Sequence, residues 1–402
     1  MPAMPEMGSS KNNALALLVT GSLMAWTFGC SSVPRPAEMK MKPNDITASA
    51  IRTLQSLKNK YAPDRHLTIF EVNVLRERNN FVLQGEVDNP AVKQEVVAAV
   101  TKTGLKVIDR IIVLPALDLN NRVCGISTLS VVNVRENPGH GSEMGTQILM
   151  GNSFKVWKQQ TNWFLVQTDD GYLGWAEGGG FVNCTPEETS AWNNSPRLIV
   201  TALEECILEQ PDPHALPTSD VVLGCLVKQV GEAGEWFQVE LPDGRGGYLP
   251  KSSAVNFLDW QKSRHATPES IEHTARSFLG RPYFWGCNTS RGMDCSGLTK
   301  LVFFLNGIPL NRNASQQLHQ GVEVALDTDL KNLKKGDLLF FGRRATGSKP
   351  EMITHVGIYL ENKLFIHSSE RVRISSLDPA SPLRDEHRIK SLLHARHMLS
   401  DS

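Results

Sequence analysis

The chain has 402 residues and a mass of 44.5 kDa, which is more than one average domain, because domains hold roughly 100–150 residues. Its 42 acidic residues balance 42 basic residues, and 41% of all residues are hydrophobic, as in an ordinary globular protein. This balance of charge excludes an electrostatic case for nucleic acid, so we expect no nucleic-acid partner.

The first 30 residues have the pattern of an export signal. Lys11 precedes an apolar run at 14–28, which is shorter than a usual membrane span and ends at Gly29 and Cys30, as the cores of signal peptides do. The small residue before Cys30 resembles a bacterial lipoprotein signal. This resemblance implies a lipid on Cys30 and a protein anchored to a membrane of the bacterial cell envelope, on the periplasmic side. The alternative is a cleaved signal peptide, or a single membrane anchor with an unmodified Cys30. Residues 31–43 are rich in proline and are predicted to be a linker.

Residues 44–116 predict a small α/β domain. Apolar residues at helical spacing within 46–57, and again after Pro90, indicate two helices. Stretches rich in β-branched residues indicate three strands, at 67–75, 81–87 and 106–114. The order α-β-β-α-β resembles a BON domain, a family linked to envelope proteins and to lipid or surface association. A spacer domain without a ligand is the alternative.

Residues 122–186 and 195–256 predict two all-β modules that share a sequence pattern. Each has short strands separated by turn signals, and each closes on Trp-Phe-X-Val followed by Gly-Tyr-Leu. This internal repeat resembles a tandem pair of bacterial SH3-like barrels. We interpret the tryptophans of the repeat, Trp163 and Trp236, as core residues, and Tyr172 and Trp175 as aromatic residues exposed on a rim.

The seven cysteines give two hypotheses for disulfides, which an exported protein can form. Cys124 and Cys184 bracket the first module, and Cys206 and Cys225 both lie in the second. The sequence alone establishes neither pairing. Because the chain has no CxxC pair and no HExxH motif, we expect no metal site and no cofactor.

Residues 265–402 are the last predicted domain, and Cys295 lies at the start of a buried helix within it. Asp294 is a favourable N-cap residue, and apolar residues recur at helical spacing from Leu298 to Leu305. Cys295 would therefore sit at a helix N-terminus. The positive end of the helix dipole lowers the pKa of a thiol there, which favours the reactive thiolate.

Two histidines downstream could serve this cysteine. His355 begins one predicted strand, at 355–360, and His367 ends a second, at 364–367. If the strands pair as a hairpin centred near Glu361, both imidazoles lie on the same side of the sheet and face each other. One histidine can then accept the thiol proton while the other orients it.

Five motifs in this region, taken in order, resemble the NlpC-type family of bacterial cell-wall cysteine peptidases, which have a papain-like fold. They are Tyr-Phe-Trp-Gly at 283–286, Asp-Cys-Ser-Gly at 294–297, Lys-Gly-Asp-Leu-Leu-Phe-Phe at 335–341, Thr-His-Val-Gly-Ile-Tyr at 354–359 and Phe-Ile-His-Ser at 365–368. The resemblance implies Cys295 as the nucleophile, His355 as the general base and His367 as the orienting third member. We therefore expect an α+β protein in which a papain-like cysteine peptidase domain follows the α/β domain and two small SH3-like β-barrels.

The resemblance also implies a substrate. It is the bond that joins D-glutamate, through its γ-carboxyl group, to the following diamino acid in peptidoglycan stem peptides (muropeptides). The oxyanion would be held by the backbone N–H of Cys295 with Tyr283 as a second donor. Further expected substrate contacts are Asp294, Ser296 and Ser315. The alternatives are a papain-like amidase or acyltransferase, and an inactive scaffold that binds the envelope.

Some members of the family with paired SH3-like barrels use the first barrel to wall off one end of the groove, and accept only peptides with a free N-terminal L-alanine. This chain has corresponding segments at 135–138, 143–147 and 171–175. We expect Glu143 to pair with the free ammonium group, and Tyr172, together with Trp175, to block a longer chain sterically. A solvated Glu143 and a rim aromatic at Tyr172 are the alternative.

Overall fold

A computed structural model describes residues 45–78 and 80–399 of the chain. The predicted export signal, Cys30 and the linker at 31–43 lie outside these residues. From Asp45 onward the chain forms one compact unit. No helix among the described residues combines the length and the apolar character that crossing a lipid bilayer requires.

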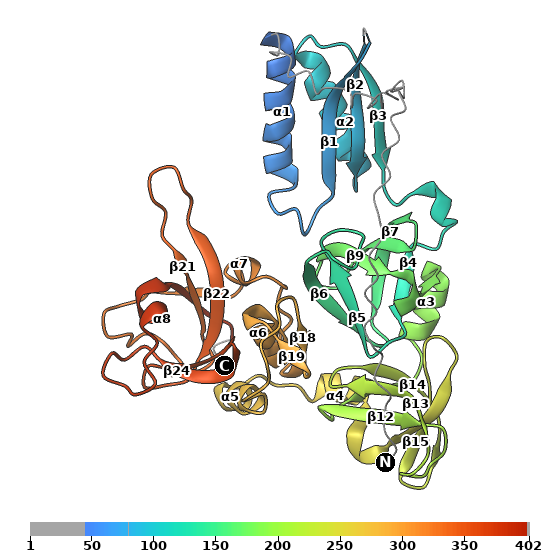
Figure 1. The fold of residues 1–402 in the computed structure, drawn as a ribbon, viewed down its shortest axis with the longest axis vertical. Helices are drawn as coiled ribbons and strands as arrows, with labels where there is room; N and C mark the ends of the chain where they lie inside the picture. The colour runs from blue at the N-terminus through green and yellow to red at the C-terminus, as the bar shows by residue number, and fades with distance from the viewer. Residues whose placement is uncertain (1–44, 79, 400–402) are drawn as a thin grey trace, which may run out of the picture. The chain divides into compact units, whose positions relative to one another are not determined.

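The N-terminal domain, as we call residues 45–116, is a three-stranded sheet with two helices packed against it (Figure 1). Its elements are α1 (Asp45–Tyr61), β1 (Phe70–Glu77), β2 (Asn80–Val87), α2 (Pro90–Lys102) and β3 (Val107–Val113). β1 and β2 form an antiparallel hairpin, and β3 pairs with β2 in parallel after the α2 crossover. Helix α2 begins where predicted, because Pro90 needs no hydrogen-bond acceptor and the Asn89 side chain accepts from Ala91 N at 2.8 Å.

Two β-barrels follow, and they have the same strand topology. Barrel 1 consists of β4 (Cys124–Ser127), β5 (Val131–Arg135), β6 (Met144–Leu149), β7 (Ser153–Gln160), β8 (Trp163–Gln167), β9 (Leu173–Glu177) and β10 (Phe181–Cys184). Barrel 2 consists of β11 (Arg197–Val200), β12 (Glu204–Leu208), β13 (Pro217–Val222), β14 (Leu226–Ala233), β15 (Trp236–Glu240), β16 (Gly246–Pro250) and β17 (Ala254–Asn256). The strand order β10-β4-β7-β8-β9-β5-β6 of barrel 1 matches, strand for strand, the order β17-β11-β14-β15-β16-β12-β13 of barrel 2. The repeat in the sequence is therefore a repeat in the structure.

The cysteines of the barrels are free thiols. Cys124 and Cys184 are direct cross-strand partners on β4 and β10, so they do meet at the ends of barrel 1. Cys206 instead faces Asp220 across β12 and β13, while the thiol of Cys225 is buried and donates to the Ser130 carbonyl at 3.4 Å. The structure thus brings the first hypothetical pair together and keeps the second apart.

The catalytic domain, as we call residues 257–399, has a six-stranded antiparallel sheet in the order β20-β25-β21-β22-β23-β24. Its strands are β18 (Asn288–Thr289), β19 (Gly292–Met293), β20 (Val322–Val324), β21 (Leu338–Arg343), β22 (Met352–Tyr359), β23 (Leu364–Ser369), β24 (Arg371–Ser376) and β25 (Leu392–His397). Its helices are α4 (Phe257–Lys262), α5 (Pro268–Arg276), α6 (Cys295–Leu305), α7 (Ala314–Gln317) and α8 (Glu386–Ser391), while α3 (Pro186–Asn193) joins the barrels. Helix α6 packs on β22 and β23 through one apolar core, which fixes Cys295 against the strands that carry the two histidines.

Candidate active site

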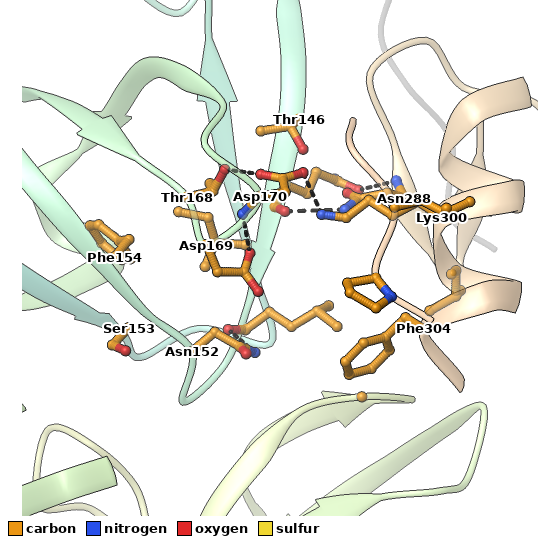
Figure 2. Close-up of a pocket in the computed structure, with 17 residues that line it drawn as sticks. Thr146, Asn152, Ser153, Phe154, Thr168, Asp169, Asp170, Asn288, Lys300 and Phe304 are labelled. Carbon is orange, nitrogen blue, oxygen red and sulfur yellow. Dashed lines mark hydrogen bonds and ion pairs between the residues drawn. The ribbon is translucent and has the colours of Figure 1, made fainter. Parts of the chain in front are cut away.

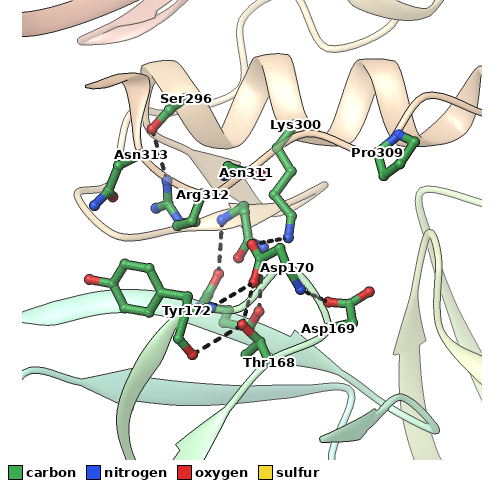
Figure 3. A network of polar contacts seen from close by, with 12 residues as sticks. Thr168, Asp169, Asp170, Tyr172, Ser296, Lys300, Pro309, Asn311, Arg312 and Asn313 are labelled. Atoms are coloured by element: carbon green, nitrogen blue, oxygen red, sulfur yellow. Dashed lines mark hydrogen bonds and ion pairs between the residues drawn. The ribbon is translucent and has the colours of Figure 1, made fainter. Parts of the chain in front are cut away.

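Asp294 and Arg312 organise the start of α6. The Asp294 carboxylate accepts from Gly297 N at 2.7 Å, which is the predicted N-cap bond, and from Gly286 N at 2.9 Å. The guanidinium of Arg312 is 1% exposed and donates to both carboxylate oxygens of Asp294 and to Ser296 Oγ. The Asp294 and Arg312 side chains are both buried, and their several hydrogen bonds restrain the backbone on both sides of Cys295, although Arg312 Nε has no partner among the described residues. Figure 3 shows Arg312 directed at Ser296.

Cys295 is buried at the first position of α6. Burial, followed by the neighbouring charge of Asp294, raises the pKa of the Cys295 thiol to about 11. The prediction that the helix dipole lowers this pKa was therefore wrong, because the cost of desolvating a thiolate outweighs the dipole here. The Val356 N–H bonds to the sulfur, which places Sγ against β22 beside His355. Among the described residues, no hydrogen bond joins Sγ to His355 itself.

His355 and His367 form a buried chain of hydrogen bonds that ends at a serine. His355 Nε2 lies 2.8 Å from His367 Nδ1, and His367 Nε2 lies 3.0 Å from Ser375 Oγ. Burial lowers the pKa of His355 well below its usual range and that of His367 to about 3, and the charge of Arg388 adds to both effects. Both imidazoles are thus neutral near pH 7, and the Nδ1 atom of His355 is left for a proton transfer.

The hairpin that carries these histidines differs slightly from the prediction. β22 and β23 pair Ile358 with Ile366 and Tyr359 with Phe365, so the hairpin is centred on Asn362 and His367 lies opposite Gly357. His355 and His367 are therefore diagonal neighbours on one face of the sheet, still within reach of each other. A Cβ atom at Gly357 would lie 3.2 Å from His367 Cβ, so the glycine leaves room for the imidazole.

A groove of about 380 Å³ opens over Cys295. Its catalytic-domain lining includes the expected residues Tyr283, Asp294, Ser296 and Ser315, and also Trp285, Asn313, Ala314, Met352, Ile353 and Thr354. Burial raises the pKa of Tyr283, and the neighbouring Cys295 and Asp294 raise it further. The phenol therefore keeps its proton and remains able to donate a hydrogen bond within the groove.

Barrel 1 supplies the opposite wall of this groove through Glu136, Glu143, Gly145 and Tyr172. The Tyr172 hydroxyl donates to Glu136 Oε1 at 2.8 Å, and the Glu136 side chain is 15% exposed. Glu143, the carboxylate that the sequence suggested, also lines the groove but is exposed to solvent. A Cβ atom at Gly145 would lie 2.3 Å from the Tyr172 hydroxyl, so the absence of a side chain there makes room for the ring.

Trp175 does not line the groove, so its prediction as a substrate contact was wrong. Side chains alternate along β9, and Trp175 lies on the same side of the strand as Leu173. Leu173 packs on Ile69 and Leu114 of the N-terminal domain, away from Cys295. The Trp175 ring lies 5.4 Å from the ammonium group of Lys158, which forms an ion pair with Glu86 of β2.

The catalytic loop and barrel 1 approach each other through a glycine. Gly286 has φ +78°, and a Cβ atom there would lie 2.3 Å from the Met144 carbonyl oxygen. Only glycine tolerates both this backbone conformation and this contact. The loop that carries Tyr283 is thereby held directly against β6.

A second cavity, of about 130 Å³, lies between barrel 1 and α6 (Figure 2). At its edge Lys300 forms an ion pair with Asp170, whose side chains are 18% and 7% exposed. Asp170 also accepts from Tyr172 N at 3.4 Å and from the Thr168 hydroxyl. This polar network, drawn in Figure 3, ties the turn before Tyr172 to helix α6.

Several groove residues have no signal in the local sequence. Arg65 and His66 come from the loop between α1 and β1 of the N-terminal domain and line the same groove as Cys295. Arg312, which lies behind Asp294 and does not line the groove itself, belongs to a segment where Ser315 was the expected contact. Its role follows from burial against Asp294, a contact between residues 18 positions apart.

Comparisons with known proteins match these parts of the chain. A model of the NlpC/P60 family matches residues 280–392, and a model of the bacterial SH3 domain matches residues 130–182. The chain is 27% identical over 267 residues to dipeptidyl-peptidase 6 of Lysinibacillus sphaericus, covering 63% of this chain and 91% of that protein. It is 29% identical over 232 residues to a gamma-D-glutamyl-L-lysine dipeptidyl-peptidase of Bacillus subtilis, covering 56% of this chain and 71% of that protein.

One solved structure is similar over most of the described chain. It is the crystal structure of an NlpC/P60 family protein from Bacillus cereus, with a TM-score of 0.58 and 22% sequence identity. The match covers 69% of this chain and 100% of that chain. The likeness supports the mixed α+β fold predicted from the sequence.

Proposed function

We propose that this chain, which carries an NlpC/P60 domain at 280–392 and a bacterial SH3 domain at 130–182, is a cysteine peptidase of the bacterial cell wall. It would hydrolyse the bond between the γ-carboxyl group of D-glutamate and the following diamino acid in peptidoglycan stem peptides. The observation that carries the proposal is the shared groove, which joins Cys295 to Glu136 and Tyr172 of barrel 1. Relatives named gamma-D-glutamyl-L-lysine dipeptidyl-peptidase support this choice of bond.

The reaction would proceed through a thioester. Cys295 Sγ attacks the γ-glutamyl carbonyl carbon while His355 Nδ1 takes the thiol proton. The Cys295 N–H, at the start of α6, and the Tyr283 hydroxyl stabilise the oxyanion. Collapse of this intermediate breaks the C–N bond, and His355 returns the proton to the leaving amine of the diamino acid. Water, deprotonated by His355, then hydrolyses the thioester and releases the dipeptide.

The resting protonation state follows from the pKa values of Cys295 and His355. A thiol pKa of about 11 and a lowered imidazole pKa mean that the pair is neutral near pH 7. Only the thiolate reacts with an alkylating agent. The rate of Cys295 alkylation by iodoacetamide, followed by mass spectrometry of its peptide, should therefore rise about tenfold per pH unit between pH 7 and 10. A rate that stays constant from pH 5 to 8 would instead indicate a preformed thiolate–imidazolium pair.

We propose that Glu136 recognises a free amino terminus on the substrate by forming an ion pair with it. A dipeptidyl-peptidase must stop the substrate two residues before the cleaved bond, and the barrel 1 wall offers a carboxylate at that end of the groove. Glu136 is less exposed than Glu143 and is held by Tyr172, so it pairs with an ammonium group more strongly. Tyr172 forms the steric wall that a peptide still attached to muramic acid would meet.

Digestion of purified muropeptides, analysed by mass spectrometry, tests the proposal. Wild type should release L-Ala-γ-D-Glu from free stem peptides that contain either L-lysine or meso-diaminopimelate, and Cys295→Ala should release none. Cys206→Ala, which removes a partly buried thiol of barrel 2, is the matched control and should retain full activity. Release of whole stem peptides from the sugar would indicate an amidase, and a product of acyl exchange would indicate an acyltransferase. The absence of any product would indicate a binding scaffold. Each of these results would refute the peptidase function.

We also propose that the protein is anchored in the cell envelope through a lipid on Cys30. The apolar run at 14–28 and the residues before Cys30 support this location. Cys30→Ser should leave the protein unprocessed or release it from the membrane fraction. An unchanged mature mass and an unchanged membrane fraction in that variant would exclude lipidation.

A further inference from the structure

The loop at 62–69, between α1 and β1, brings the N-terminal domain into the active-site groove. Arg65 and His66 of this loop line the groove together with Cys295. The chemistry proposed above uses no residue of the N-terminal domain. Because Arg65 and His66 line the groove without taking part in this chemistry, we ask whether they contribute to substrate recognition.

The loop is held from two sides. Asp64 Oδ2 accepts from Gln316 Nε2 of α7 at 2.6 Å, which ties the loop to the catalytic domain. Leu173 N donates to the His66 carbonyl at 2.7 Å, which ties it to β9 of barrel 1. Ile69, at the end of the loop, packs against Leu173 in an apolar cluster. The side chains between these anchors are thus placed by contacts with both neighbours.

Glu136 is the residue that the loop contacts in the groove. Arg65 Nη2 lies 2.8 Å from Glu136 Oε2, and His66 Nε2 lies 3.1 Å from Glu136 Oε1. The carboxylates of Asp64 and Glu136, in that order, raise the pKa of His66 to about 9, so both loop residues that contact Glu136 are cations at neutral pH. The carboxylate that would read the substrate amine is already paired when the groove is empty.

The two cations differ in how firmly they are held. The Arg65 side chain is 68% exposed, and an exposed ion pair contributes little to stability. The His66 side chain is 19% exposed, lies between Asp64 and Glu136, and stacks on Tyr172 with ring centroids 4.9 Å apart and planes 13° apart. An incoming ammonium group can therefore displace Arg65 from Glu136 but leaves His66 in place.

We propose that Arg65 and His66 determine the specificity of the groove for peptides with a free amino terminus. Arg65 is a displaceable counterion that competes with the substrate amine for Glu136. His66 is a positioning residue that holds Glu136 and Tyr172 in the orientation that receives the amine. The N-terminal domain thus tunes which peptides the catalytic domain accepts. This inference rests on the peptidase function proposed above.

The two residues should change substrate affinity in opposite directions. The substrate is the free tripeptide L-Ala-γ-D-Glu-diamino acid, with whichever diamino acid, L-lysine or meso-diaminopimelate, wild type cleaves faster. On this peptide, Arg65→Ala should lower KM about two- to fivefold, the range expected for loss of an exposed competing ion pair. Arg65→Lys, which keeps the charge, should restore the KM of wild type. His66→Ala should raise KM on the order of tenfold, because Glu136 loses a charged hydrogen bond that orients it. In all variants kcat should stay near that of wild type.

Three controls separate recognition from folding and chemistry. The N-acetylated tripeptide has no ammonium group, so its kcat/KM should be the same in Arg65→Ala and wild type. Arg110→Ala removes another exposed arginine, which pairs with Glu77 in the same domain at 2.8 Å, and should leave the cleavage of both peptides unaffected. Iodoacetamide should alkylate Cys295 at the same rate in every variant, because the binding of this small reagent does not involve Glu136.

Specific results would overturn the inference. An unchanged or raised KM in Arg65→Ala, or an equal change for free and acetylated peptides, means that Arg65 does not compete for Glu136. An unchanged KM in a folded His66→Ala variant means that His66 does not position Glu136. If wild type cleaves no stem peptide at all, the peptidase function fails instead, and the two failures are distinguishable by this one measurement.

Discussion

The two barrels have the same strand order but different relations to the active site. In both, the residue after the second strand is a glutamate whose N–H donates across the loop at 2.9 Å, from Glu136 to the Glu143 carbonyl in barrel 1 and from Glu209 to the Leu216 carbonyl in barrel 2. Glu136 lines the groove, whereas Glu209 is exposed to solvent. The two copies thus differ in what this loop faces, and we infer from this that barrel 1 serves recognition and barrel 2 serves support.

The barrels also differ in how they attach to the catalytic domain. Barrel 1 uses the buried Asp170–Lys300 pair, with side chains 7% and 18% exposed, whereas barrel 2 uses the Asp220–Arg291 pair, with side chains 46% and 43% exposed. An ion pair shielded from water couples two domains more strongly than one that water screens. We infer that barrel 1 is held rigidly because its position sets the shape of the groove.

The largest difference between the barrels should appear when these attachments are broken. Lys300→Ala leaves Asp170 buried without its cation and should lower the free energy of unfolding by about 3 kcal/mol. Arg291→Ala should lower it by about 0–1 kcal/mol. Urea unfolding followed by tryptophan fluorescence measures both values. Equal losses in the two variants would show that burial of the pair does not distinguish the barrels.

Exchanging the two equivalent glutamates tests recognition. Glu136→Ala should lower kcat/KM for the free tripeptide about 10- to 100-fold, the range expected for loss of a hydrogen bond to a charged group. Glu209→Ala, at the same place in barrel 2, should have no effect. Steady-state kinetics on both peptides gives the comparison. A loss of activity in Glu209→Ala similar to that in Glu136→Ala would contradict the division of roles.

A smaller effect is expected from the two repeat tyrosines. Tyr172→Phe removes the 2.8 Å hydrogen bond to Glu136 but keeps the ring that stacks on His66, so kcat/KM should fall about fivefold, the typical effect of one neutral hydrogen-bond donor. Tyr248→Phe, at the equivalent position of barrel 2, should be neutral. A larger loss on the N-acetylated peptide than on the free one would argue against a bond that serves the amine.

The smallest effect should come from Glu143. This exposed carboxylate lines the groove, but a water-screened charge contributes little, so Glu143→Ala should change kcat/KM for the free tripeptide less than about twofold. The Glu136→Ala variant, measured in the same assay, is its positive control. If Glu143→Ala lowers kcat/KM more than Glu136→Ala does, the substrate amine is bound by Glu143 and not by Glu136.

The sequence predicts the chemical half of the site well because that half is local. Asp294 and Cys295 are adjacent, and strand alternation places His355 and His367 on one face even with the hairpin centre shifted by one residue. The helix cap at Asp294 and the repeat that relates the two barrels likewise follow from short patterns. Whatever depends on neighbours within a few positions could be predicted.

The recognition half depends on which distant surfaces meet, and no local pattern encodes this. Arg65 and His66 stand in an ordinary helix-to-strand loop and reach Glu136 only because the N-terminal domain packs on Leu173. The same packing turns Trp175 away from the groove. The raised pKa of Cys295 has a similar origin, since the surrounding core and not the helix alone sets the cost of a charge.

The segment that follows the N-terminal domain is an exposed site for proteolytic cleavage. Leu117, in the short turn at 117–119 between β3 and barrel 1, is 98% exposed, and such sites are where proteases nick a chain. A single cut there would separate everything that precedes it, including Cys30, from the barrels and the nucleophile. If Cys30 carries the proposed lipid, the remaining fragment would leave the membrane once the N-terminal domain dissociates, and it would also lack Arg65 and His66. One proteolytic event would thus change where the hydrolase acts and which peptides it prefers at the same time.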